Sequence, residues 1–285
     1  MTAAALELSS PVGVIAGGGA MPFAVADSLK ARGLNPVLFA LKGVCDPVAV
    51  KRFRHHWITV GQYGRTTKLL RAENCKDLIF IGTLVRPALS EIRLDWGTLR
   101  VMGRIWSAFR GGDDHLLSGV GRIFEQEGFR LLGVKEAAPD LLMPEGNVTR
   151  HVPDQNALAD IARGRDVLRA LGPFDIGQAV VVIGGHVVGV EGIEGTDGLL
   201  RRIAELRKNG RIRALAGRGV LVKTPKSTQD LRYDLPTVGS RTIEGVAAAG
   251  LSGVAVAAGN TIVADAQAMI EAAEAAGLFV TGLPS

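Results

Sequence analysis

One polar run in the chain carries the residue types that phosphoryl chemistry needs. It reads K-T-P-K-S-T-Q-D-L-R-Y-D-L-P-T-V-G from Lys223 to Gly239. Cationic side chains stabilise developing oxyanion charge, and carboxylates bind a metal ion or orient a water. An apolar stretch typical of a strand precedes the run and anchors one end of it. A solvated charged loop has a similar composition, but a long run punctuated by prolines in a compact domain favours a functional loop.

A second cluster combines carboxylates with glycines. It reads V-E-G-I-E-G-T-D-G and contains Glu191, Glu194, Gly195, Thr196 and Asp197. Carboxylates, waters and phosphate oxygens are the ligands that Mg²⁺ prefers. The same residues fit a helix over 198–208 whose start is capped by Thr196 and Asp197, with solvated glutamates beside it. The sequence leaves both interpretations open.

A glycine cluster, Gly17, Gly18 and Gly19, separates a predicted strand from a predicted helix. Backbone amides at such a position can approach a phosphate or a sugar, and the helix N-terminus favours an anion. A plain tight turn explains the cluster equally well. The spacing matches neither G-x-G-x-x-G nor a P-loop, and the following strand, 38–41, lacks the acidic residue that would bind a ribose. The pattern therefore disfavours a nicotinamide cofactor.

Two further motifs begin where predicted elements meet loops. Gly82, Thr83 and Arg86 follow a predicted parallel strand, at the sheet edge where ligands bind in open α/β sheets. Arg86 would clamp a diphosphate, or pair with a carboxylate at the surface. In G-G-D-D, one aspartate caps the next helix, and Asp114 is a candidate for binding a sugar hydroxyl or a metal.

These motifs need a scaffold, and the hydrophobic periodicity predicts an α/β protein with two domains. Strands and helices alternate in the N-terminal half, which predicts a Rossmann-like parallel sheet. Strands are expected at 12–16, 36–41, 57–60 and 77–81, and helices at 21–32, 66–73, 99–109 and 114–127. The predicted domains are 1–140 and 154–285, joined by a proline-containing linker at 141–153.

The C-terminal half mixes a hairpin with helical crossovers, which predicts a mixed sheet. Strands are expected at 179–183, 187–191, 220–223, 254–257, 261–264 and 278–280, and helices at 154–171, 198–208, 240–249 and 266–276.

The composition suits a globular protein with an anionic ligand. The 285 residues are 47% hydrophobic and 21% charged, with a formal net charge of +5. This excess of cations suits a phosphate-bearing substrate or an anionic membrane surface, and it is too small to indicate nucleic acid. Cys45 and Cys75 form no metal motif and are expected as buried thiols in a reducing compartment. Met1–Ser10 resembles no signal peptide, so we expect a cytoplasmic protein that contacts the membrane only peripherally.

Taken in order, the motifs resemble one known family, the UDP-2,3-diacylglucosamine diphosphatases (pyrophosphatases) of lipid A biosynthesis that are unrelated to the calcineurin-like metallophosphatase version. The resemblance extends over almost the whole chain. Its stretches are I-A-G-G-G near Ile15, G-T-L-V-R-P at Gly82, G-D-D at Gly112, D-L-L-M-P-E-G at Asp140, D-I-G-Q-A-V at Asp175, E-G-T-D at Glu194 and the long run at Lys223.

The resemblance implies Mg²⁺-dependent hydrolysis of a lipid-linked uridine nucleotide sugar to UMP and 2,3-diacylglucosamine 1-phosphate, by a homodimer. The family's aspartate in K-x-x-Q-D falls on Asp230, either as a metal ligand or as the group that positions water. We predict catalytic roles for Asp230, Lys223, Lys226 and Gln229, and metal binding by Asp230, Asp234 and Asp197. The predicted substrate-binding residues are Gly17, Gly18, Gly19, Gly82, Thr83, Arg86, Asp114, Glu194, Gly195, Thr196, Asp197 and Thr237.

Two other functions fit the same residues. A uridine nucleotide-sugar transferase would move the sugar to an acceptor, and a non-catalytic carrier or sensor would bind a phosphorylated glycolipid without releasing UMP. Incubation with substrate and water alone separates hydrolysis from transfer, and a carrier or sensor would bind tightly without releasing UMP under any metal.

Overall fold

The structure is a computed structural model that describes residues 7–83, 95–98, 101, 113–226, 230–233 and 235–284, with the backbone alone for 113–117. Its contacts divide the chain into two compact units. Unit 1 comprises Met1–Leu141 and Asp230–Asp234, and unit 2 comprises Leu142–Gln229 and Leu235–Ser285. The chain therefore returns to unit 1 for a few residues in the middle of the polar run.

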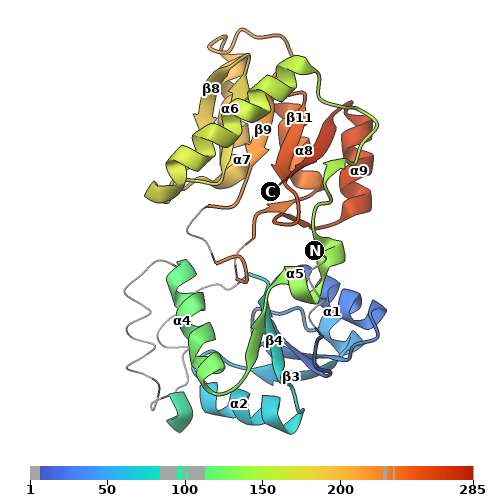
Figure 1. The fold of residues 1–285 in the computed structure, drawn as a ribbon, viewed down its shortest axis with the longest axis vertical. Helices are drawn as coiled ribbons and strands as arrows, with labels where there is room; N and C mark the ends of the chain where they lie inside the picture. Colours follow the sequence, from blue (N-terminus) through green and yellow to red (C-terminus); the bar gives the residue numbers. More distant parts are fainter. Residues whose placement is uncertain are drawn as a thin grey trace. The chain divides into compact units, whose positions relative to one another are not determined.

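Unit 1 contains the predicted parallel sheet (Figure 1). The strands are β1 (Val12–Ala16), β2 (Pro36–Leu41), β3 (Arg54–Ile58), β4 (Asp77–Ile81) and β5 (Arg130–Leu132), in the order β3-β2-β1-β4-β5. All neighbouring pairs are parallel. The third strand begins three residues earlier than predicted, and β5 was not predicted because three residues give too short a pattern.

Helices cover both faces of this sheet. Helices α2 (Tyr63–Ala72) and α4 (Asp113–Gln126) pack on one face, where Leu70 and Phe124 contact Phe39 and Leu78. Helix α1 (Met21–Ala31) packs on β1 and β2. It covers the other face of the sheet, toward which every second side chain of β1 points. The remaining elements are η1 (Ala49–Arg52), α5 (Val134–Ala137) and η3 (Pro139–Leu141). The helix predicted at 99–109 lies outside the described residues, apart from Val101.

Unit 2 contains the predicted mixed sheet (Figure 1). Its order is β6-β13-β11-β9-β7-β8, in which β9, β11 and β13 are parallel and β6, β7 and β8 run antiparallel to their neighbours. The strands are β6 (Gly146–Asn147), β7 (Ala179–Ile183), β8 (His186–Val190), β9 (Val220–Lys223), β11 (Gly253–Ala257) and β13 (Phe279–Leu283). A separate parallel pair joins β10 (Thr237–Val238) to β12 (Ile262–Val263).

Unit 2 has three layers. Helices α7 (Gly195–Lys208), α8 (Ser240–Ala248) and α9 (Ala266–Ala275) bury Leu199, Ile243 and Met269 against one face of the sheet. Helix α6 (Gln155–Leu171) and the short η4 (Gly172–Phe174) follow each other in the chain, and α6 buries Ile161 against the other face.

The start of α7 differs from the sequence-based prediction. The helix begins at Gly195, its N-cap residue is Glu194, and no side chain caps it. Thr196 and Asp197 therefore lie within the first turn and do not cap it. In the sequence, a glycine before a threonine and an aspartate is typical of a loop, so the prediction placed the helix start too late. The earlier start puts Asp197 in the first turn, where its negative charge interacts favourably with the helix dipole.

The structure also locates the predicted linker and the two cysteines. Residues 142–153, predicted as a linker, lie in unit 2, where Val148 N–H donates to Val280 O at 3.0 Å. Cys45 and Cys75 are free and buried, as predicted. Among the described residues, no helix has the length and apolar character needed to cross a membrane.

Candidate active site

The segment Asp230–Tyr233 packs at the carboxyl ends of β4 and β5 in unit 1. Gly133, directly after β5, contacts it closely: a Cβ at Gly133 would lie 3.1 Å from Arg232 Cα. The Tyr233 ring meets the ring of Phe80, near the end of β4, edge-on at 6.2 Å between centroids. The carboxyl edge of a parallel sheet is where open α/β folds bind ligands. Packing against residues distant in sequence therefore places Asp230 at the carboxyl edge of the parallel sheet.

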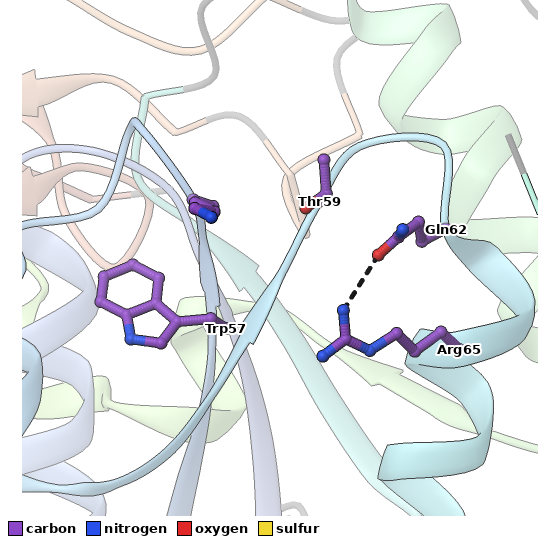
Figure 2. Close-up of a pocket in the computed structure, with 5 residues that line it drawn as sticks. Trp57, Thr59, Gln62 and Arg65 are labelled. Carbon is purple, nitrogen blue, oxygen red and sulfur yellow. Dashed lines mark hydrogen bonds between the residues drawn. The ribbon is translucent and has the colours of Figure 1, made fainter. Parts of the chain in front are cut away.

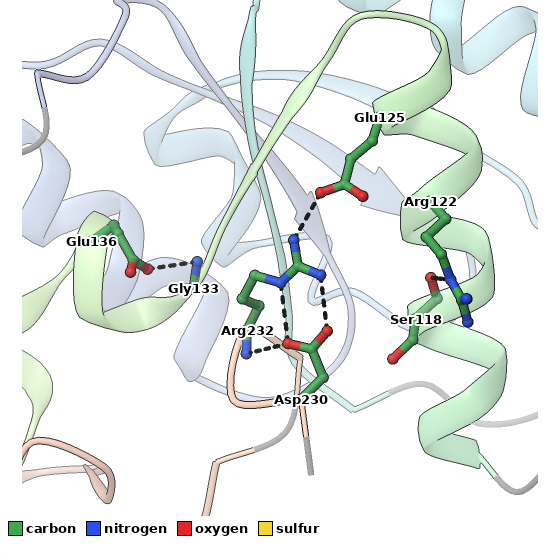
Figure 3. A network of polar contacts seen from close by, with 7 residues as sticks. All are labelled: Ser118, Arg122, Glu125, Gly133, Glu136, Asp230 and Arg232. Carbon is green, nitrogen blue, oxygen red and sulfur yellow. Dashed lines mark hydrogen bonds and ion pairs between the residues drawn. The ribbon is translucent and has the colours of Figure 1, made fainter. Parts of the chain in front are cut away.

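Arg232 holds Asp230 in place (Figure 3). Its Nε donates to Asp230 Oδ1 at 3.1 Å and its Nη2 donates to Oδ2 at 2.9 Å, a bidentate pair. Its backbone N–H also donates to Oδ1, at 3.1 Å. The third guanidinium nitrogen, Nη1, donates to Glu125 Oε1 of α4 at 2.7 Å. Arg232 thus ties the Asp230 carboxylate to a helix of the Rossmann-like unit.

The charges around Asp230 fix its protonation state. The hydrogen bond from Arg232 lowers the pKa of Asp230 below its usual value, and it outweighs the opposing effect of burial. The positive charge of Arg122 on α4 lowers this pKa further. Asp230 is therefore ionised throughout the neutral range. A carboxylate of this kind suits charge neutralisation or metal binding better than proton abstraction, for which a pKa near the working pH is best.

Tyr233 anchors the same segment from the other side. Its ring lies over Gly121 of α4, and a Cβ built at Gly121 would collide with the Tyr233 hydroxyl. The hydroxyl is buried and has no hydrogen-bond partner among the described residues. Burial raises the pKa of Tyr233 to about 12, so it stays neutral. The Arg232 guanidinium lies 5.3 Å from the centre of this ring, a cation–π contact.

A divalent cation fits Asp230 as a single protein ligand. Among the described residues, no group of three or more His, Cys, Asp or Glu is placed to hold a metal. Mg²⁺ in phosphate sites, however, commonly uses one or two carboxylates and completes its shell with phosphate oxygens and waters. A carboxylate has about four lone-pair sites, and the Arg232 bonds use two on Oδ1 and one on Oδ2. Counting only the described residues, one position on Asp230 Oδ2 is left for a cation.

The predicted lysines and Thr237 lie in unit 2. Lys223 ends β9 and is buried, with Nζ donating to Thr237 O of β10 at 3.0 Å. Lys226 pairs with Asp175 at 2.7 Å, its side chain mostly shielded while that of Asp175 is exposed. The structure thus divides the polar run: its lysines belong to unit 2 and Asp230 belongs to unit 1.

The acidic cluster of unit 2 is made of individually paired groups. Glu191 is buried and accepts hydrogen bonds from Gln178 N–H and Thr196 Oγ1, both at 2.8 Å. Glu194 pairs with Arg202 at 2.7 Å, and Asp197 pairs with Arg241 at 2.9 Å. Within the described residues these carboxylates do not converge on a common cation position. The metal role predicted for Asp197 stays a prediction.

The two glycine motifs lie together at the end of β1 and β4. Gly17 N–H donates to Ile81 O at 2.9 Å, and Gly18 and Thr83 exchange backbone hydrogen bonds at 2.8 and 3.0 Å. A Cβ at Gly17 would lie 2.6 Å from Thr83 O, and one at Gly82 would lie 2.7 Å from Gly18 O. Close backbone approach therefore requires glycine at both positions. The amides of Gly17 and Gly18 are already bonded, whereas Gly19 is exposed. The ligand-binding role of all three glycines stays a prediction.

Several predicted residues cannot be placed. Arg86, Gln229 and Asp234 lie outside the described residues, as does the side chain of Asp114. Conversely, sequence reasoning missed Arg232 and Glu125 as site residues. Arg232 stands two positions after Asp230, so the signal was present in the motif. Glu125 carries no sequence signal, because its pairing depends on how unit 1 folds.

Comparisons with known proteins cover both units. The family model described as LpxI N-terminal domain matches residues 11–141, and that described as LpxI C-terminal domain matches residues 144–281. The chain is also 41% identical over 272 residues to a protein of Caulobacter vibrioides named UDP-2,3-diacylglucosamine pyrophosphatase LpxI, across 95% of this chain and 97% of that protein.

Proposed function

Because the chain belongs to the LpxI family, we propose that it hydrolyses UDP-2,3-diacylglucosamine in lipid A biosynthesis. Water attacks one phosphorus of the diphosphate, the bridging P–O–P bond breaks, and UMP and 2,3-diacylglucosamine 1-phosphate leave, the two hydrogens of the water going to their phosphates or to solvent. The observation that carries the assignment to a site is Asp230, ionised and held by Arg232 at the carboxyl edge of the parallel sheet.

We further propose that Asp230 serves as a ligand of Mg²⁺. The ion would supply positive charge for the diphosphate when bound. The lowered pKa of Asp230 and the open position on Oδ2 support this role over that of a general base. Lys223 and Lys226 are proposed to take up negative charge as the bond breaks. Asp234 and Asp197 remain proposed as additional ligands.

The decisive assay is incubation of the purified protein with UDP-2,3-diacylglucosamine and water alone. A hydrolase releases UMP and the sugar 1-phosphate in equal amounts, whereas a transferase needs an added acceptor and a carrier releases nothing. Asp230→Ala should reduce the rate by about a thousandfold or more if it removes a metal ligand. Near-normal turnover by this variant would overturn the role of Asp230 while leaving the activity itself established.

We also propose a cytoplasmic protein that touches the inner membrane peripherally and forms a homodimer. A substrate with two acyl chains supports the membrane contact. In unit 2, Phe174 of η4 and Ile193 after β8 are 72% and 109% exposed, and they are proposed to contact lipid. Sedimentation with anionic vesicles tests this: Phe174→Ser with Ile193→Ser should reduce binding, and unchanged binding would exclude these turns. Light scattering tests the dimer, which rests on the family resemblance.

A further inference from the structure

Two cavities in unit 1 lie away from Asp230 and share a wall. The first, of about 370 Å³, is lined by Lys42, Trp57, Thr59, Gln62 and Arg65. The second, of about 530 Å³, is lined by Lys42, Trp57 and the loop Gly43–Pro47, which includes Asp46. Lys42 and Trp57 border both. Their sizes fall within the range of small-molecule sites, roughly 300–1,000 Å³.

The cavities lie at the carboxyl ends of β2 and β3. Lys42 directly follows β2 and Thr59 directly follows β3, while Gln62 and Arg65 stand at the start of α2. Figure 2 shows Trp57 on one side of β3 and the Gln62–Arg65 pair on the other. This is the same edge of the sheet that carries the glycine motifs and Asp230. The position agrees with the general rule for ligand sites in open parallel sheets.

The lining combines an aromatic face, two cations and one carboxylate. Trp57 is half-buried, with His55 edge-on to its indole at 6.0 Å, so the ring is supported. Arg65 Nη1 donates to Gln62 Oε1 at 3.2 Å, which leaves the Gln62 amide N–H groups to donate elsewhere. The N–H groups of Gly64 and Arg65 at the start of α2 already bond to Asp95. An anion here would therefore be recognised by the Lys42 and Arg65 side chains.

Asp46 supplies a carboxylate that can accept hydrogen bonds from a ribose. The sequence-based prediction considered only 38–41 for such a residue and missed it. Its Oδ1 accepts from Val48 and Ala49 N–H at 2.7 and 3.2 Å, and these bonds lower the pKa of the carboxyl. Among the described residues Oδ2 has no partner, so it can accept from two hydroxyls. The carboxylate comes after the end of β2, beyond the stretch 38–41 in which a ribose-binding residue was sought.

Together these groups match the parts of one ligand class. An indole face stacks on a nucleobase, a carboxylate accepts from a ribose diol, and cations pair with phosphate. Gln62 and Thr59 can donate to carbonyl oxygens, which pyrimidines of the uracil type carry. The first cavity has no aliphatic side chain in its lining, and the second has only Val44 and Pro47, too few to enclose a pair of acyl chains. From this convergence we propose that the paired cavities bind a uridine 5′-phosphate group, the nucleotide end of the substrate.

The position also agrees with the place of Asp230. In the order β3-β2-β1-β4-β5, the cavities lie over β2 and β3 and Asp230 lies by β4 and β5. Strands are about 4.8 Å apart, so about three spacings, roughly 14 Å, separate them. An extended nucleoside diphosphate bridges a distance of this order. The diphosphate would cross the end of β1, near Gly19. This inference rests on the proposed function for the identity of the ligand.

The test is calorimetric titration of the full-length protein with UMP and with uridine. Trp57→Ala should weaken both by about tenfold or more, because stacking is lost, and Trp57→Phe should restore most of the affinity. Trp96→Ala is the matched control, since Trp96 is 84% exposed in the same unit and lines neither cavity. Lys42→Ala should weaken UMP binding by severalfold or more and leave uridine nearly unchanged. Asp46→Asn should weaken the binding of UMP and of uridine but not that of 2′,3′-dideoxyuridine 5′-phosphate, which lacks the diol.

Hydrolysis assays then separate this inference from the proposed function. The Trp57→Ala enzyme should show a raised KM for UDP-2,3-diacylglucosamine with kcat less affected. If Trp57→Ala and Lys42→Ala both bind UMP like the wild type, the cavities are not the nucleotide site, although the wild type can still be a hydrolase. If the wild type binds UMP through Trp57 and Lys42 yet releases none from the substrate, the site stands and the hydrolase assignment fails. Because Lys42 is exposed, its variant tests the site even if Trp57→Ala unfolds.

Discussion

The ring of Tyr233 fills the space that a side chain at position 121 would occupy. Gly121 lies in the middle of α4, where glycine costs about 1 kcal/mol of helix stability relative to alanine. The presence of glycine at this position is explained by the Tyr233 ring, which occupies the space that a larger side chain would need. This contact fixes the segment Asp230–Tyr233 on the Rossmann-like unit, and with it the Asp230 carboxylate.

We expect Gly121→Ala to destabilise the protein by about 1–3 kcal/mol, because the new methyl group displaces Tyr233. In a Tyr233→Ala background the same substitution should be neutral or stabilising, since alanine is the better helix former. Urea unfolding of the four proteins measures this coupling. Equal effects of Gly121→Ala in both backgrounds would show that the tyrosine does not depend on the glycine.

Arg232→Met should shift the acid limb of the pH–activity profile to higher pH. Arg232 is the largest cause of the lowered pKa of Asp230, and burial acts in the opposite direction once the arginine is gone. The wild type should keep Asp230 ionised below the ordinary aspartate pKa of about 3.9. Profiles of kcat/KM against pH measure the shift. Glu125→Gln, which keeps Arg232, should move the limb less, and an unmoved limb in Arg232→Met would contradict the electrostatic role.

Removal of divalent cations should abolish hydrolysis, and Mg²⁺ should restore it. Asp230→Asn keeps the shape of the side chain but removes its charge, so this variant should need far more Mg²⁺ for half-maximal rate. The measurement is turnover as a function of free Mg²⁺ after chelation. Full activity of the wild type in excess chelator would exclude the metal, whatever the effect of the Asp230 variant.

Lys226→Ala should lower kcat/KM by at least about tenfold while changing the free energy of unfolding by no more than about 0.5 kcal/mol. The pair with Asp175 is exposed on the aspartate side and contributes little to stability. Asp175→Asn is the control: it removes the partner and keeps the cation. If the two variants lower kcat/KM by the same factor, the ion pair acts by holding the loop, and the positive charge of Lys226 has no direct role in the reaction.

Neither cysteine should react with thiol reagents in the folded protein at pH 8. Burial raises the pKa of Cys75 to about 12 and also raises that of Cys45, so the reactive thiolate is scarce as well as shielded. Two thiols should become titratable together on unfolding in urea. Rapid labelling of the native protein would show that one of the two sites opens locally.

The sequence predicted the α/β fold well where patterns are local. The strand–helix alternation of unit 1, the hairpin of β7 and β8, and the cap of α9 by Asp265 all depend on residues close together in the chain. The start of α7 was misplaced because the first turn contains glycine and polar residues. The strand β5 was missed because a three-residue strand leaves too little periodicity.

By itself, the sequence determined which residue types are available: a motif with Asp230 among cations, and a family order that spans the chain. Only the tertiary structure decided which of them meet. It assigns Asp230 to unit 1 and Lys223 to unit 2 although seven positions separate them, and it brings Arg232 to Glu125. Hydrogen bonds and close packing act over a few ångströms in space and are indifferent to distance along the chain, so no local pattern encodes these partners.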